Sequence, residues 1–302
     1  MRQLWVVAVV GACSFEHGVV PTGMDSGGRS GSADAPPDMP MSQGGTAWST
    51  PVEITELTGF SEDDPSLTAD LLEIYFGSRR TGGAGMEDIW HAKRASVTDP
   101  WGTPENVAPL NTMDTETTGK ITSDGLFIYF TRTGNDPDIY FSYRTTTQDP
   151  WAAATRVNEL STNDPDYGPA VRLDRLRTVL CRGRTVAEEA IWVTERTSIA
   201  QTWPAASVIS ELDEAGYSEC DPMEPTDNVL YFATNHTADG KYDIVRTSRP
   251  NAQSPFTTPV PVAGINADGF EDRDPWVSAD EKYMVFSSDR SGGVFKLFLS
   301  TR

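Results

Sequence analysis

One block of sequence recurs along this chain at intervals of about 50 residues, which is the period of propeller and solenoid proteins. It begins as DPSLTADLLEIYF at Asp64, returns as GKITSDGLFIYF at Gly119, and recurs in three more divergent copies. Each copy places an acidic residue in a turn ahead of a short apolar strand: Asp70, Asp124, Asp174, Asp227 and Asp280. The chain is therefore expected to fold as a ring or stack of equivalent β-units.

Each copy predicts four short strands, as in a propeller blade. After the turn comes an apolar run such as Ile74–Phe76, and then a second run that starts with an acidic residue, such as Asp88–Trp90. An aromatic residue precedes the next strand and is expected to pack between neighbouring blades: Trp101, Trp151, Trp203 and Phe256. The Asp124-Gly125 pair predicts a type I′ hairpin turn, because glycine tolerates positive φ.

The two ends of the repeat region predict how the ring closes. The fifth copy ends at Arg302 before its aromatic-led strand, and the segment Trp48–Ile54 resembles Trp101–Val107 of the first copy. The N-terminal strand, about residues 48–57, is therefore expected to complete the last blade and remove the open sheet edge. The predicted fold class is all-β, a five-bladed β-propeller of four-stranded blades.

Two segments, DPSLTADLLEIYFGSRRTGG and VSADEKYMVFSSDRSGG, resemble the WD40-like Pro-Asp (PD40) repeats of the TolB propeller. Such repeats also occur in bacterial envelope lipoproteins, and the resemblance covers residues 61 to 302. It implies a propeller exported to the cell envelope. TolB has six blades and an additional N-terminal α/β domain, so its partners are not carried over to this chain.

The first residues resemble a bacterial signal peptide with a lipobox. Met1-Arg2-Gln3 is followed by apolar Leu4–Val10 and by Gly11-Ala12-Cys13, in which Cys13 would carry the lipid. The alternatives are an ordinary signal peptide or a buried cysteine. The predicted domains are the signal peptide at 1–13, a disordered Gly/Ser/Pro-rich tether at 14–46, and the propeller at 47–302.

The charge of the chain limits the classes of binding partner, and its cysteines leave open whether a disulfide forms. The formal net charge of −20 disfavours nucleic-acid binding, because phosphates would be repelled. It is expected to serve solubility rather than selective binding of cations. In an exported protein Cys181 and Cys220 would be able to form a disulfide, and the alternative is two isolated, partly buried thiols.

The sequence contains no catalytic motif, no histidine pair at metal-ligand spacing and no phosphate-binding glycine loop, so no catalytic residue, metal ligand or cofactor is assigned. The candidate site is a ring of carboxylates at one mouth of the central channel: Asp64, Glu116, Asp166, Asp221 and Asp274. The favoured interpretation is structural, with these carboxylates capping turns and pairing with recurring arginines such as Arg80, Arg132 and Arg290. The alternatives are a Ca²⁺ or polar-ligand site and a glycosidase acid and base.

These observations predict a monomeric, non-enzymatic lipoprotein of the bacterial cell envelope, held at the membrane by its N-terminal lipid only. Its propeller would act as a scaffold that binds an envelope protein or peptide. The alternative is a carbohydrate-active protein, either lectin-like or a glycoside hydrolase, that uses the acidic channel mouth.

Overall fold

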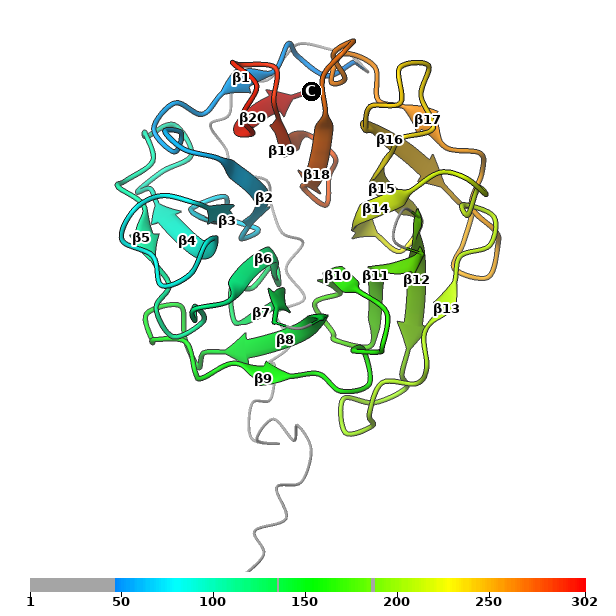
Figure 1. The fold of residues 1–302 in the computed structure, drawn as a ribbon, viewed down its shortest axis with the longest axis horizontal. Helices are drawn as coiled ribbons and strands as arrows, with labels where there is room; N and C mark the ends of the chain where they lie inside the picture. The colour runs from blue at the N-terminus through cyan, green and yellow to red at the C-terminus, as the bar shows by residue number, and fades with distance from the viewer. Residues whose placement is uncertain (1–46, 135, 186–187) are drawn as a thin grey trace, which may run out of the picture.

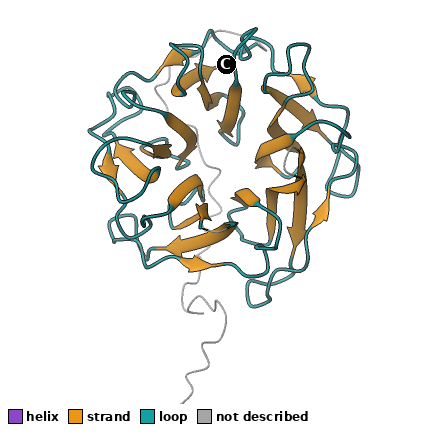
Figure 2. Cartoon of the chain, in the orientation of Figure 1, coloured by secondary structure: helices purple, strands orange, loops and turns teal. Residues whose placement is uncertain are grey.

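The computed structural model describes residues 47–134, 136–185 and 188–302, which form five four-stranded antiparallel sheets. The sheets are arranged as blades around a central axis (Figure 1), and loops connect the strands without any helix among the described residues (Figure 2). The predicted all-β, five-bladed propeller is confirmed. No described segment forms a helix long and apolar enough to cross a membrane. The predicted signal peptide, Cys13 and tether lie outside the described residues.

The first strand of each blade lies nearest the axis and is called the inner strand here. Blade 1 consists of β2 (Glu62–Leu67), β3 (Glu73–Ser78), β4 (Asp88–Lys93) and β5 (Glu105–Asn106). Blade 2 consists of β6 (Thr115–Ile121), β7 (Phe127–Thr133), β8 (Pro137–Tyr143) and β9 (Thr155–Arg156). Blade 3 consists of β10 (Asp166–Val171), β11 (Arg177–Thr185), β12 (Glu188–Glu195) and β13 (Ser207–Val208). Blade 4 consists of β14 (Glu219–Thr226), β15 (Val229–Thr234), β16 (Asp243–Ser248) and β17 (Val260–Pro261).

Blade 5 joins the two ends of the described chain. Its strands are β18 (Asp272–Val277), β19 (Tyr283–Ser288), β20 (Lys296–Thr301) and the N-terminal β1 (Val52–Glu53). Strand β1 pairs antiparallel with β20, with Val52 opposite Leu299 and Glu53 opposite Phe298. The predicted closure by the N-terminal strand is therefore confirmed, and the outer edge of the last sheet is covered as it is in the other four.

The hydrophobic core is divided into five clusters, each between two neighbouring sheets. One cluster joins Leu67 and Ile74 of blade 1 to Trp276 and Val285 of blade 5, and the other four repeat this arrangement around the ring. The aromatic landmarks occupy equivalent buried places in these clusters: Trp48, Trp101, Trp151, Trp203 and Phe256. Their predicted packing between blades is confirmed, and burial of each such side chain contributes about 1.5–3 kcal/mol.

An arginine covers each of these aromatic rings, a feature that sequence reasoning did not predict. The guanidinium of Arg94 lies 4.2 Å from the centre of the Trp101 ring, and that of Arg302 lies 4.7 Å from Trp48. Arg144, Arg196 and Arg249 do the same in the other blades. Each of these arginines also donates to a backbone carbonyl in the turn after the inner strand, so it joins two strands of its blade.

The hairpin turns differ from the predicted type I′ geometry. A type I′ turn needs positive φ at both central residues, whereas in Asp124-Gly125 only Gly125 has it, at 73°. The Gly125 N–H donates to the carbonyl of Thr122 at 2.8 Å, so the left-handed residue closes the turn instead of lying within it. Leu71 has positive φ at the same place in blade 1, which shows that the turn geometry does not depend on glycine.

Cys181 on β11 and Cys220 on β14 form a disulfide, so of the two alternatives the paired state is the one found. Both cysteines are buried, and the bond joins blade 3 to blade 4. Their sulfurs are therefore not available as metal ligands, although Glu189 lies close to both.

Candidate functional site

Every inner strand contains a β-bulge near its start, where the pairing register with the second strand shifts. The residue in the bulge has φ between 51° and 55° in all five blades: Asp64, Thr118, Gly168, Asp221 and Asp274. This left-handed conformation costs a non-glycine residue about 1–3 kcal/mol. A bulge re-aims the side chain that it carries, and here it directs three carboxylates toward the axis.

The structure brings together three of the five predicted ring residues, Asp64, Asp221 and Asp274. Glu116 and Asp166 lie two positions earlier in their strands, where they pair with Arg132 at 2.7 Å and with Arg182 at 2.5 Å. Both carboxylates are fully buried in these ion pairs. The predicted ring therefore combined residues from two different positions of the inner strands. The sequence pattern did not distinguish the bulge from the arginine-paired position two residues earlier.

The arginine-paired position recurs in blades 1 and 5 as Arg80 with Glu62 and Arg290 with Asp272. Each of these arginines also donates to a backbone carbonyl of the segment that enters its blade, such as Leu57 or Ile265. The expected pairing between the recurring arginines and repeat carboxylates is confirmed for this position.

We call Asp63, Asp64, Glu87, Asp221 and Asp274 together the acidic mouth. One carboxylate oxygen from each of Asp64, Asp221 and Asp274 lies within 4.8 Å of the others, and the same holds for Asp63, Asp64 and Glu87. Asp64 belongs to both groups and is 4% exposed. Three blades thus contribute acids to one small volume at the start of the inner strands.

Backbone groups of neighbouring blades hold these carboxylates in place. The Asp64 N–H donates to Oδ2 of Asp274 at 3.4 Å, and the Thr118 N–H donates to Oδ2 of Asp64 at 2.9 Å. The Gly168 N–H in turn donates to the hydroxyl of Thr118 at 3.1 Å. The bulge side chains of blades 5, 1 and 2 therefore each accept a hydrogen bond from the bulge N–H of the next blade. These contacts between blades support the structural interpretation for this position.

Burial and mutual repulsion shift the protonation of the acidic mouth. Burial, followed by the charge of Asp274, raises the pKa of Asp221 to about 7 and raises that of Asp64 well above its usual value. Burial, followed by the charges of Glu87 and Asp64, does the same for the pKa of Asp63. Burial also acts to raise the pKa of Asp274, but Arg273, Lys120 and hydrogen bonds from Ser287 and Asp221 outweigh it, so this pKa is lowered.

Two resident cations flank the cluster. Nε of Arg273 lies 3.3 Å from Oδ2 of Asp221, and its guanidinium lies 4.1 Å from the centre of the Tyr242 ring. Lys120 on β6 is 5% exposed, and its Nζ has no hydrogen-bond partner. Its charge acts to lower the pKa values of Asp64, Asp221 and Asp274, so Lys120 is a counter-ion of the cluster.

A cavity of about 200 Å³ opens at the acidic mouth, and its walls include Tyr167, Glu189 and Phe295. The loops on this face carry exposed apolar side chains, each two residues before a strand that starts here. We call these side chains the apolar rim: Phe60 (45% exposed), Met86 (75%), Met113 (91%), Phe270 (38%) and Val294 (46%). The acidic mouth is thus a recessed polar site in a face with apolar projections.

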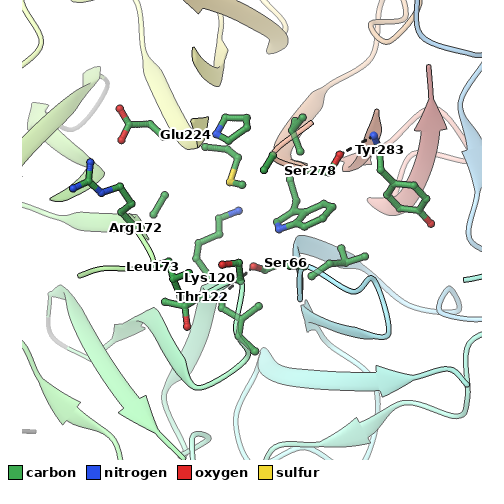
Figure 3. Close-up of a pocket in the computed structure, with 18 of the residues that line it drawn as sticks. Ser66, Lys120, Thr122, Arg172, Leu173, Glu224, Ser278 and Tyr283 are labelled. Atoms are coloured by element: carbon green, nitrogen blue, oxygen red, sulfur yellow. Dashed lines mark hydrogen bonds between the residues drawn. The ribbon is translucent and has the colours of Figure 1, made fainter. Parts of the chain in front are cut away.

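The other end of the channel has a different character. A cavity of about 250 Å³ lies there, lined mainly by apolar residues such as Ile121, Met223 and Trp276. In Figure 3, Lys120 extends into the middle of this cavity, while Arg172 and Glu224 lie at its side. We call this cavity the apolar funnel, and Lys120 separates it from the acidic mouth.

The spacing of the carboxylates limits their chemistry. The oxygens of Asp64, Asp221 and Asp274 lie within 4.8 Å, and Asp221 forms a hydrogen bond to Asp274 that requires a proton on one of them. Glycosidases place their two carboxyl groups about 5–5.5 Å or 6.5–9.5 Å apart so that the sugar and water fit between them. The nearest oxygens of the cluster are therefore closer together than the carboxyl groups of the wider, inverting arrangement.

Sequence reasoning missed three residues of the site: Glu87, Lys120 and Arg273. A usable signal for the bulge was the Asp-Pro pair at Asp64, Asp221 and Asp274, which is absent after Glu116. Lys120 was also detectable as the lone cation in an inner strand that otherwise consists of threonine, glutamate, glycine and isoleucine. The position of Glu87, which comes from a loop before β4, had no such signal.

No protein-family model matches the chain, and no curated protein matches it. Solved structures do resemble the fold. The endo-arabinase from Bacteroides thetaiotaomicron has a TM-score of 0.58 at 11% identity over 84% of this chain and 97% of that one. A thermostable family-43 glycoside hydrolase has a TM-score of 0.57 at 11% identity, covering 80% of this chain and 90% of the hydrolase.

TolB from Acinetobacter baumannii has a TM-score of 0.51 at 14% identity. The match covers 82% of this chain but only 56% of that TolB protein. At such identities the similarity establishes the propeller fold alone. The chain is therefore similar in fold both to TolB and to glycoside hydrolases.

Proposed function

We propose that this chain is a non-enzymatic, TolB-like lipoprotein of the bacterial cell envelope whose propeller binds a protein or peptide partner. The observation that carries the proposal is the face around the acidic mouth. Its carboxylates Asp64 and Asp274 accept hydrogen bonds from backbone N–H groups of neighbouring blades, and exposed apolar side chains project from the loops of the same face. Exposed apolar side chains gathered on one face are a feature of protein-interaction surfaces.

The envelope location rests on the start of the sequence and on the PD40-like repeats. A signal peptide that ends at Cys13, followed by a flexible tether, would place a monomeric propeller away from the membrane surface, with the lipid as its only anchor. The buried Cys181–Cys220 disulfide supports export, because such bonds persist in oxidising compartments. Replacing Cys13 with alanine is expected to release the protein from the membrane fraction.

Crosslinking in intact envelopes, followed by affinity capture of the full-length protein, tests the proposed function. We expect one protein to be captured by the native chain and much less of it by a double variant, Met86→Glu and Met113→Glu, on the apolar rim. Val260→Glu is the matched control, because Val260 is 57% exposed on the outer strand β17. Equal capture by all three proteins would refute binding at this face.

A carbohydrate-active role is the second candidate, favoured by one observation. A carboxyl with a pKa of about 7, Asp221, lies beside a carboxylate whose pKa is lowered, Asp274. Divergent pKa values are the usual property of an acid and base pair. Hydrolysis of any member of a panel of chromogenic arabinosides, xylosides and glucosides, lost on Asp221→Asn, would establish this candidate. We expect no hydrolysis, and a glycan array tests the lectin-like form.

A further inference from the structure

We propose that the acidic mouth binds one positively charged side chain, a lysine or arginine, of the protein partner. This inference rests on the proposed function and specifies the chemistry of the partner. The partner segment would carry apolar residues next to its cation, because the apolar rim, contributed by blades 1, 2 and 5, lies on the same face as the cavity into which the cation enters.

The first argument is the balance of charge. The acidic mouth contains five acidic residues, and the cations in contact with them or acting on them are Arg79, Arg273 and Lys120. Arg79 is 60% exposed, so water screens its contact with Glu87. Burial, followed by the charges of neighbouring acids, raises the pKa values of Asp63, Asp64 and Asp221, so a further cation beside them would favour their ionised forms. A further cation would therefore be stabilised here, and an anion would be repelled.

The second argument is an unpartnered acceptor. Oδ1 of Asp64 is buried and accepts no hydrogen bond from the residues that the structure describes, although Oδ2 of the same carboxylate accepts one each from Thr117 and Thr118. Oδ1 of the neighbouring Asp63 is also buried and has no donor among the described residues, while the Asp63 carboxyl interacts with Glu87. A buried acceptor without a donor is destabilising. Both residues line the cavity, so a donor that enters from the apolar rim would reach them.

The third argument is size and shape. The cavity of about 200 Å³ is smaller than the usual small-molecule pocket of about 300–1,000 Å³ and suits one long side chain. Tyr167 and Phe295 in its wall offer aromatic surface to the aliphatic stem or to the charged end of such a side chain. The formal net charge of the whole chain, −20, would also speed the approach of a basic segment.

A metal ion satisfies these arguments less well. Ca²⁺ needs six to eight oxygen ligands, but Oδ2 of Asp64 and Oδ2 of Asp274 already accept backbone N–H and hydroxyl donors. The charges of Lys120 and Arg273 also act on this cluster. An ammonium or guanidinium group brings its own donors and needs only the free acceptors of Asp63 and Asp64.

Isothermal titration at low salt with two synthetic peptides tests the inference. The probes are acetyl-Leu-Arg-Leu-amide and its neutral analogue acetyl-Leu-citrulline-Leu-amide, which has the same shape without the charge. We expect the arginine peptide to bind the native chain about tenfold or more tightly than the citrulline peptide. A lysine version of the peptide is expected to behave like the arginine one.

Two variants locate the binding site. Asp64→Asn and Asp221→Asn each replace an ionisable carboxyl of the acidic mouth by a neutral amide of nearly the same size, and each is expected to weaken binding of the arginine peptide about tenfold. Glu105→Gln is the matched control, because its side chain is 76% exposed on the outer strand β5. Unfolding of each variant in urea is measured alongside as a control for folding. If Asp64→Asn does not fold, binding of the peptide to Asp221→Asn tests the inference instead.

Four results would overturn the inference: no binding of the arginine peptide, equal binding of the citrulline peptide, no effect of both aspartate variants, or displacement of the peptide by CaCl2 at equimolar concentration. Failure here is distinguishable from failure of the proposed function. If the captured envelope partner binds Asp64→Asn as tightly as the native chain, the partner-binding function stands and only the cationic side chain is refuted.

Discussion

Trp48 gives the most direct test of how this ring is held closed. Its side chain is 6% exposed in the cluster between blades 4 and 5, and the guanidinium of Arg302 lies 4.7 Å from its ring. Trp48→Ala removes a large buried side chain and leaves a cavity, which costs about 3–5 kcal/mol. Loss of the contact with Arg302 adds about 0.5–1 kcal/mol.

This loss is large relative to the 5–15 kcal/mol that stabilises a typical domain. With a dependence on urea of about 3 kcal/mol per molar for a domain of this size, the unfolding midpoint should fall by about 1 M or more. The assay is equilibrium unfolding in urea under oxidising conditions, followed by far-ultraviolet circular dichroism so that removing a tryptophan does not alter the signal.

Two variants calibrate this measurement. Trp101→Ala changes the equivalent residue of blade 1, where Arg94 covers the ring at 4.2 Å, and should cost a similar amount. Val52→Ala changes a residue of β1 that is 65% exposed and should cost less than about 0.5 kcal/mol. A cost below about 1 kcal/mol for Trp48→Ala, beside a loss of several kcal/mol for Trp101→Ala, would refute the reasoning that the N-terminal segment is an equal part of the ring.

Three further predictions concern single contacts. Because the pKa of Asp221 is raised from 3.8 to about 7 in the folded state, this group contributes a loss of up to about 1.4 kcal/mol of stability per pH unit as the pH rises from 4 to 7. The urea midpoint of the native chain should therefore fall more steeply, or rise less, over this range than that of Asp221→Asn, and parallel pH profiles of the two proteins would contradict the assignment. Changing both Cys181 and Cys220 to serine should cost about 2–4 kcal/mol and make the urea midpoint insensitive to reductant. Arg132→Met should cost about 3–5 kcal/mol in thermal unfolding, because it leaves Glu116 buried without its cation, and Glu116→Gln added to it should restore part of the loss.

The repeat in the sequence was sufficient to predict the blades, because each copy carries its own turn residue, apolar strands and aromatic landmark. The resemblance between Trp48–Ile54 and Trp101–Val107 was sufficient to predict closure, since equivalent residues fill equivalent places between sheets. The pairing of arginines with repeat carboxylates also followed from their recurrence, as at Arg132 and Glu116.

The candidate site did not follow from the repeat. A shift of two positions along an inner strand decides whether a carboxylate pairs with an arginine, as Asp166 does, or meets other acids at the axis, as Asp221 does. The pattern of acidic residues does not show where the strand bulges, and Glu87 reaches the site from a loop of variable length. Predictions of the acidic ring were therefore only partly matched by the geometry.

The amino-acid sequence by itself determined the number of blades, their strand order and the closure of the ring, because these depend on local patterns repeated in each copy. Only the tertiary structure decided that Asp64, Asp221 and Asp274 form one buried cluster with Lys120 on its far side. The physical reason is that the charges of residues from four blades act on one another only after the ring has closed and excluded water from its axis.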